Sequence, residues 1–133
     1  MVDAANVMGA RPDGWWRDRV GAALRLYREL ARLAAGGRPV LGEEAGPPAF
    51  VMVLEGTARA AASRLPAADA GRPGEVAVVQ AHGSGDDAIV ALLRELPGRR
   101  IVVTADRQLR DRSLAAGATV RGPGWLLGLL RGD

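Results

Sequence analysis

The feature that most constrains the fold is a series of apolar runs that are continuous instead of alternating. Strands covered on both faces have this pattern, which is typical of parallel sheets. Segments of helical periodicity separate the runs, and this alternation predicts an α/β fold with right-handed crossovers. The predicted strands cover residues 1–2, 50–54, 76–79, 101–103 and 118–120.

Helical patterns fill the segments between these runs. Apolar residues recur at helical spacing from Val20 to Ala34, while Arg25, Arg28 and Arg32 share the opposite, solvated face. A length of 133 residues with 48% hydrophobic residues predicts a single domain over residues 1–133. Shorter helices are predicted over residues 87–96, 108–116 and 125–130, and glycine and proline clusters predict loops at 36–39, 46–48, 65–66 and 71–74.

The composition excludes several kinds of chemistry. The absence of cysteine excludes thiolate metal sites and cysteine nucleophiles, and a single histidine leaves a Ser-His-Asp triad without support. All 18 basic residues are arginine, so Schiff-base chemistry and a P-loop lysine are excluded as well. Any catalysis is therefore expected to depend on carboxylates. A net charge of +3 permits an anionic partner, and with neither a secretory signal nor a membrane span in the pattern, a cytoplasmic protein is expected.

Acidic residues follow every strong strand. Because the carboxyl ends of parallel strands meet at one edge of the sheet, where ligands bind, these acids are expected to converge in one crevice. Carboxylates packed together raise one another's pKa unless a cation neutralises them. With oxygen ligands only, Mg²⁺ or Mn²⁺ is the best match, and such a site favours phosphodiester hydrolysis. The acids are Asp3, Glu55, Asp86, Asp87 and Asp106.

Four of the five acids also have a purely structural interpretation. Asp86 and Asp87 stand at a helix start, where Ser84 and Asp87 have capping-box spacing. Asp106 can likewise cap the next helix, and Glu55 can be a solvated residue beside Arg59. Asp3 has no obvious helix to cap. The catalytic interpretation therefore depends on four strand ends agreeing.

Several polar and aromatic residues are candidate substrate contacts. Asn6 can bind a carboxylate ligand or a phosphate, and the Thr104 hydroxyl can face a phosphate or satisfy the strand end. Trp15 and Trp16, next to Arg17 and Arg19, can stack on single-stranded bases, or one indole can anchor the first helix; we expect one buried and one exposed. Ser84 and Arg107 complete the set.

In order and placement, these motifs resemble the PIN-like nucleases, particularly the NYN branch with its YacP-like proteins. The resemblance implies a three-layer α/β/α, Rossmann-like domain with a mainly parallel sheet of about five strands, and Mg²⁺- or Mn²⁺-dependent cleavage of RNA. It also implies an acidic centre of Asp3, Asp86 or Asp87, and Asp106, supported by Asn6. A match on Asp-Ala-Ile selects Asp87, whereas a match on paired acids before the helix selects Asp86. The motifs are Asp-Ala-Ala-Asn-Val at 3–7, Glu55, Gly-Asp-Asp-Ala-Ile at 85–89 and Thr-Ala-Asp at 104–106.

Three functions remain open at this stage. The leading hypothesis is a metal-dependent endoribonuclease with RNA as its substrate, acting as a monomer or a homodimer. A nucleotide pyrophosphohydrolase would use the same acids without needing Trp15, Trp16 or the arginine face. An inactive PIN-like module would bind RNA or a protein without divalent ions, and its RNA affinity would fall steeply with salt.

Overall fold

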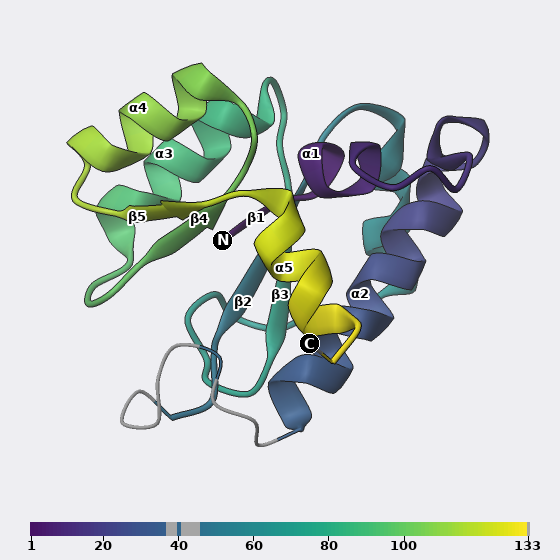
Figure 1. Cartoon of the computed structure of the whole chain (residues 1–133), viewed down its shortest axis with the longest axis horizontal. Coiled ribbons are helices and arrows are strands. Elements are labelled where there is room, and N and C mark those ends of the chain that lie inside the picture. Colours follow the sequence, from purple (N-terminus) through teal and green to yellow (C-terminus); the bar gives the residue numbers. More distant parts are fainter. Residues whose placement is uncertain (37–39, 41–45, 133) are drawn as a thin grey trace.

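The chain folds around one parallel five-stranded sheet with the strand order β3-β2-β1-β4-β5 (Figure 1). The computed structural model describes residues 1–36, 40 and 46–132. The predicted strands are present, with ends shifted by at most one residue. Most of the loop predicted at 36–39 lies outside the described residues. The strands are β1 (Val2–Asp3), β2 (Phe50–Leu54), β3 (Val76–Gln80), β4 (Ile101–Val103) and β5 (Thr119–Arg121).

The four predicted helices are also present, with ends shifted by up to two residues. They are α2 (Arg19–Ala35), α3 (Gly85–Glu95), α4 (Arg107–Ala115) and α5 (Pro123–Leu130). Two helical segments that were not predicted are α1 (Ala4–Gly9) and the 3₁₀ segment η3 (Gly56–Arg64), and a short 3₁₀ turn, η1 (Trp15–Arg17), precedes α2. Within the described residues, none of the helices is both long and apolar enough to cross a membrane.

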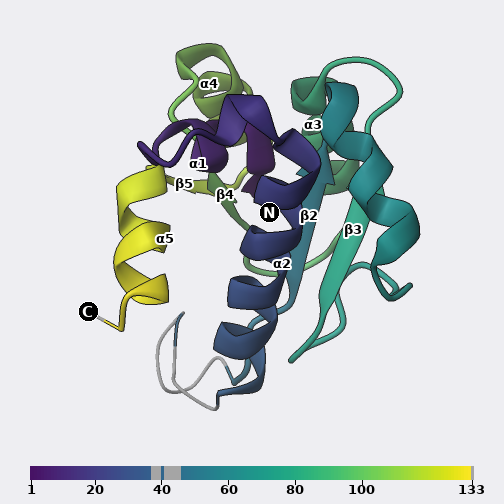
Figure 2. The same cartoon turned by 90° about the vertical axis from the view of Figure 1, so that its right-hand side faces the viewer.

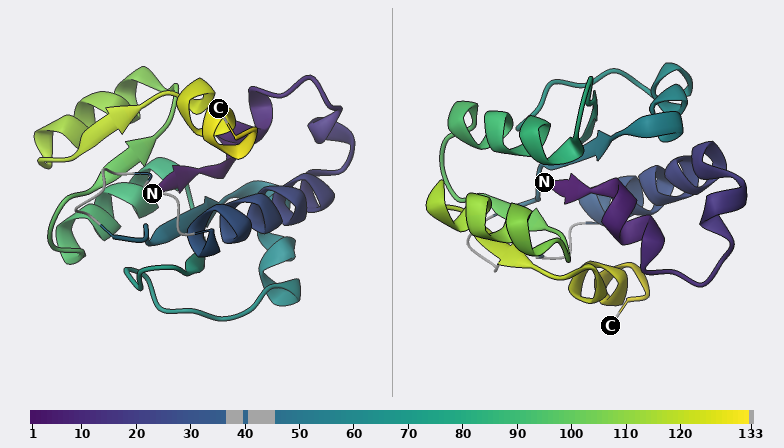
Figure 3. Two further views of the ribbon diagram at one scale, coloured as in Figure 1. Left: turned by 60° about the horizontal axis from the view of Figure 1, so that its bottom comes forward. Right: turned by 90° about the horizontal axis from the view of Figure 1, so that it is seen from above.

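The sheet separates two apolar layers, as the continuous runs predict. Along β2, Phe50, Met52 and Leu54 pack on the side of α1, α2 and α5, whereas Val51 and Val53 pack on the side of α3 and α4. Figure 2 shows α2 in front of the strands with α5 beside it, and the view from above in Figure 3 shows α3 and α4 together on the other side. The architecture is therefore three-layer α/β/α, which confirms the predicted fold class.

The shortest strand occupies the centre of the sheet. β1 pairs in parallel with β2 on one side and with β4 on the other. The chain moves outward from β1 through β2 to β3, then crosses to β4 and continues to β5, so the strand order reverses between β1 and β4. In open α/β sheets, ligands bind at the carboxyl ends of the strands at this switch point. Asp3 is the last residue of β1, and Thr104 directly follows β4.

Candidate active site

Asp3 is a buried carboxylate held by residues from two distant parts of the chain. Its side chain and backbone are only 3% exposed. Asn6 Nδ2 donates to Asp3 Oδ2 at 2.7 Å, and Thr104 Oγ1 donates to the same oxygen at 2.9 Å. Burial raises the pKa of Asp3, the bonds from Thr104 and Asn6 lower it, and the charge of Glu55 raises it, with a net rise. Asp3 therefore has a fixed orientation, and its two hydrogen bonds compensate only in part for the burial of its charge.

The expectation that Asp3 has no helix to cap is wrong. Asp3 occupies the N-cap position of α1, but its side chain makes no capping bond there. The six residues of α1 hold no long apolar stripe, so their periodicity is too short to be recognised. The helix matters for the site because it brings Asn6 back over Asp3.

Thr104 and Asn6 also connect Asp3 to Asp106. The backbone N–H of Asp106 donates to Thr104 Oγ1 at 3.1 Å, and the N–H of Ala105 donates to Asn6 Oδ1 at 3.3 Å. Asp106 in turn caps α4, with its Oδ1 accepting from the N–H of Leu109 at 2.8 Å. Thr104 is 3% exposed and its hydroxyl is engaged on both sides. The structure thus places the hydroxyl between Asp3 and the start of α4, and its predicted contact with a phosphate stays a prediction.

Glu55 reaches across to the helix that carries the paired acids. The N–H of Gly85, the first residue of α3, donates to Glu55 Oε2 at 2.8 Å. A Cβ atom at Gly85 would lie 3.4 Å from the Glu55 carboxyl carbon, which is van der Waals contact, so the carboxylate packs directly against the start of α3. Arg59, the expected partner of Glu55, instead donates to the carbonyls of Gly56 and Ala81.

Asp86 and Asp87 have different surroundings, which separates two residues that the sequence left equivalent. Burial raises the pKa of Asp86, and the charges of Asp106, Asp3 and Glu55 raise it further, while Arg112 lowers it. Asp87 is largely exposed and pairs with Arg112, with 2.9 Å between Oδ1 and Nη1. Its backbone N–H donates to Ser84 Oγ at 3.2 Å, so Ser84 is the N-cap of α3. Asp86 is thus the one of the pair that lies near the other acids.

The four acids Asp3, Glu55, Asp86 and Asp106 converge electrostatically, but they are not packed as a closed cage. Across residues 1–36, 40 and 46–132, no three Asp, Glu or His side chains are grouped tightly enough to hold a metal ion by themselves. Mg²⁺ usually keeps several waters and takes one or two carboxylates from the protein. The donor types and the raised pKa values fit that kind of open site.

The tryptophan pair begins η1, the short segment directly before α2. Trp16 is 55% exposed, whereas Trp15 is partly buried against the core, close to the expected division between the two. Their rings meet edge to face with centroids 6.3 Å apart. Arg17 stacks over Trp16 at 5.7 Å and Arg19 over Trp15 at 5.3 Å, measured from the guanidinium carbon to the ring centroid. A cavity between Trp15 and Glu55 opens next to α1.

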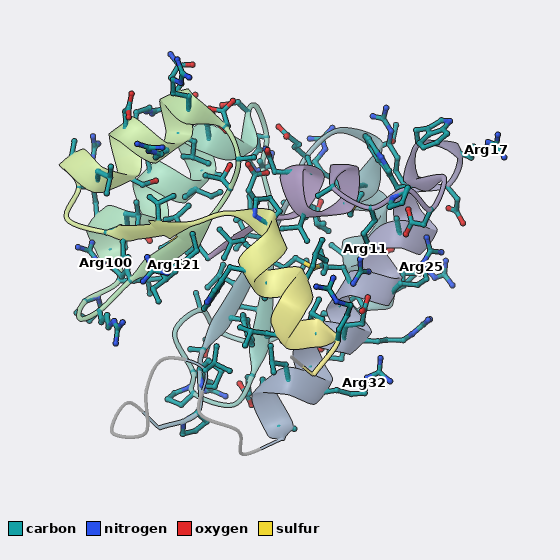
Figure 4. The ribbon with its side chains drawn as sticks, viewed as in Figure 1. Arg11, Arg17, Arg25, Arg32, Arg100 and Arg121 are labelled. Carbon is teal, nitrogen blue, oxygen red and sulfur yellow. The ribbon has the colours of Figure 1, made fainter. Side chains whose placement is uncertain are left out.

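The arginines are distributed over the exterior. Figure 4 shows Arg17, Arg25 and Arg32 along the outside of η1 and α2, with Arg100 and Arg121 on the β4 and β5 side. Arg25, Arg28 and Arg32 are exposed on one face of α2, as predicted, and Arg25 lies 3.8 Å from Asp13. Arg107 is exposed at the first position of α4, directly after Asp106.

Comparisons with known proteins give a result at the level of structure. No protein-family model and no curated protein matches the sequence. The crystal structure of Rae1 (YacP) from Bacillus subtilis matches with a TM-score of 0.65 at 18% sequence identity, over 98% of this chain and 73% of that chain. The match confirms the expected resemblance to YacP at the level of the fold: the chain shares the three-layer α/β/α fold of Rae1 (YacP).

Proposed function

We propose that this protein is a Mg²⁺- or Mn²⁺-dependent endoribonuclease that hydrolyses RNA phosphodiester bonds at the β1–β4 switch point. The observation that carries the proposal is the environment of Asp3. A buried carboxylate at the end of the central strand is oriented by Asn6 and Thr104, and lies within electrostatic reach of Glu55 and Asp86. Asp86 in turn lies within reach of Asp106. Repulsion among clustered carboxylates destabilises a fold, and such clusters are typical of sites that bind a ligand.

A divalent ion at this site would supply charge neutralisation and an activated water for attack on phosphorus. Asp3, Asp86 and Asp106 are the residues that would hold it, with Glu55 at the edge of the cluster. Asn6 and Thr104 would keep Asp3 in one orientation, and the N-cap bond keeps the Asp106 side chain over the start of α4. The exposed arginines of α2 give the RNA backbone a favourable electrostatic approach.

The direct test is cleavage of end-labelled single-stranded RNA by the full chain with Mn²⁺ or Mg²⁺. The comparison variant combines Asp3→Asn and Asp106→Asn, because asparagine also caps helices well and so preserves the start of α4. We expect cleavage that requires the metal and is lost in the double variant. Equal cleavage by both proteins would contradict the proposal.

Two further measurements separate the other functions. Faster turnover of nucleoside triphosphates than of RNA would assign the site to a pyrophosphohydrolase. RNA binding in chelator without any cleavage on metal addition would assign the chain to a binding module.

A further inference from the structure

A small cavity shares one residue, Glu55, with the group of acids at the strand ends. Its volume is about 280 Å³, and its walls include Ala4, Ala5 and Met8 from α1, Trp15 and Arg19 from the segment before and at the start of α2, and Glu55 after β2. Ala4 and Ala5 immediately follow Asp3 in the chain. Pockets for drug-sized ligands start at about 300 Å³, so this cavity suits one flat ring system.

The polar groups of the cavity are arranged for a flat ligand with hydrogen-bond donors. The guanidinium of Arg19 already lies over the Trp15 ring, which leaves a planar cation available for stacking with a base. The α1 wall is small and apolar, and the Glu55 carboxylate supplies acceptor oxygens. A carboxylate accepts from the exocyclic amino group of a base and repels a carbonyl oxygen in the same place.

Glu55 connects the cavity to the candidate active site. Glu55 lines the cavity, and its Oε2 accepts from the N–H of Gly85, the residue directly before Asp86, at 2.8 Å. Ala4, which follows Asp3 in the chain, lines the same cavity. A nucleotide whose phosphate reaches the acids would therefore have its base close to the opening of the cavity.

We infer that this cavity binds one unpaired nucleobase next to the phosphate that is cleaved, stacked on the Arg19–Trp15 pair and selected by Glu55 for an amino group. The inference rests on the proposed ribonuclease function and adds a substrate preference to it. Single-stranded RNA is the substrate class, with adenine, guanine or cytosine favoured over uracil at this position.

The test measures binding in chelator, where no cleavage occurs. Fluorescence anisotropy compares two labelled nine-nucleotide RNAs of otherwise uniform uridine, one with a central adenosine and one with a central abasic nucleotide. Loss of a stacked base costs roughly tenfold in affinity. We expect the full chain to bind the adenosine RNA about tenfold more tightly than the abasic RNA.

The informative variant is Arg19→Gln, because Arg19 is exposed and its replacement leaves the core intact. We expect it to reduce the tenfold preference to about twofold or less, since the base loses its stacking partner. Arg17→Gln removes the same charge two positions earlier and outside the cavity, and we expect it to keep the preference. An equal loss of affinity for both RNAs in Arg19→Gln, or no loss, would overturn the inference.

Glu55→Gln tests the choice of base. We expect it to reduce the difference in affinity between an RNA with a central adenosine and one with a central uridine. An unchanged difference in affinity would contradict selection by Glu55. The two proposals fail separately. Base-dependent binding without cleavage in Mn²⁺ would overturn the ribonuclease function and leave the cavity as a base-binding site alone, whereas cleavage by a chain with no base preference would overturn only the cavity.

Discussion

The two ends of β4 carry polar clusters with opposite electrostatics. At the beginning of the strand, Arg100 donates from Nη1 to the carbonyl of Leu93 and from Nη2 to the carbonyl of Ala116 at 3.0 Å. These carbonyls belong to the C-terminal ends of α3 and α4, where the helix dipole favours a positive charge. At the other end, Thr104 supports Asp3 among acids that repel one another.

The difference indicates which cluster stabilises the fold and which one serves a ligand. The Arg100 guanidinium complements the negative C-terminal ends of the α3 and α4 dipoles and connects both helices to the sheet. Its buried Nε has no hydrogen-bond partner among the described residues. Asp3 and Asp86 have raised pKa values, so their charged forms are disfavoured by the fold itself. Substitutions at the two ends of β4 should therefore separate stability from activity.

The largest effect is expected for Asp3→Asn. Removing this charge should lower metal-dependent RNA cleavage by at least about 100-fold, because the bonds from Asn6 and Thr104 would then orient a poor cation ligand. Initial rates on labelled RNA at saturating Mn²⁺ measure it. Asp111→Asn makes the same change on the exposed face of α4 and serves as the control. Retention of a tenth of the activity would refute the role of Asp3.

Arg100→Ala should give the reverse result. We expect the free energy of unfolding to fall by about 2 kcal/mol, because two partly buried carbonyls lose a charged donor. Cleavage per folded molecule should change by less than twofold. Urea denaturation measures the stability, with Arg110→Ala on exposed α4 as the control. A loss of cleavage without a loss of stability would contradict a purely stabilising role for Arg100.

Thr104→Val tests whether the buried hydroxyl acts through Asp3. Loss of a hydrogen bond that orients a metal ligand typically costs about 10- to 100-fold. We expect a fall in kcat of this size at a temperature where the variant is fully folded, and Thr104→Ser should recover most of the activity. If Val and Ser have equal activity, the hydroxyl does not position the carboxylate.

Asp86→Asn and Asp87→Asn should differ, although the residues are neighbours. We expect about a tenfold loss of cleavage for Asp86→Asn, which faces the other acids, and a smaller loss for Asp87→Asn. Exposed ion pairs such as Asp87–Arg112 contribute about 0 to 1 kcal/mol to stability. Cleavage rates of the two variants, measured in parallel, test this difference. A larger loss of cleavage for Asp87→Asn would show that Asp87, and not Asp86, acts with the other acids.

The smallest effect concerns pH and stability. Because folding raises the pKa of Asp3, the folded state binds its proton more tightly than the unfolded state. The contribution of Asp3 to stability therefore falls as the pH rises from its ordinary 3.8 through the raised value, and stays low above it. In chelator near pH 7, Asp3→Asn should melt a few degrees higher than the wild type, with the gap closing toward pH 4. Added Mn²⁺ should raise the Tm of the wild type alone.

Local patterns in the sequence were sufficient for the layers of the fold. The continuous apolar runs at β2, β3 and β4 and the helical stripe of α2 are readable because each pattern extends over a whole element. Short elements were harder to predict from the sequence, and α1 was missed because its six residues have no recognisable period. The position of an acid at or after the end of each of the first four strands followed from the same local patterns.

The sequence by itself determined that this is an α/β chain with carboxylates at the strand ends, since strand periodicity and turn residues are encoded within a few positions. Only the tertiary structure decided which groups meet. Asp3 and Thr104 are 101 positions apart and touch because β1 and β4 are paired, and Asp86 faces the acids while Asp87 turns to Arg112 because of where α3 starts. The cavity of α1, Trp15 and Glu55 arises in the same way, because strand order and helix placement set its walls.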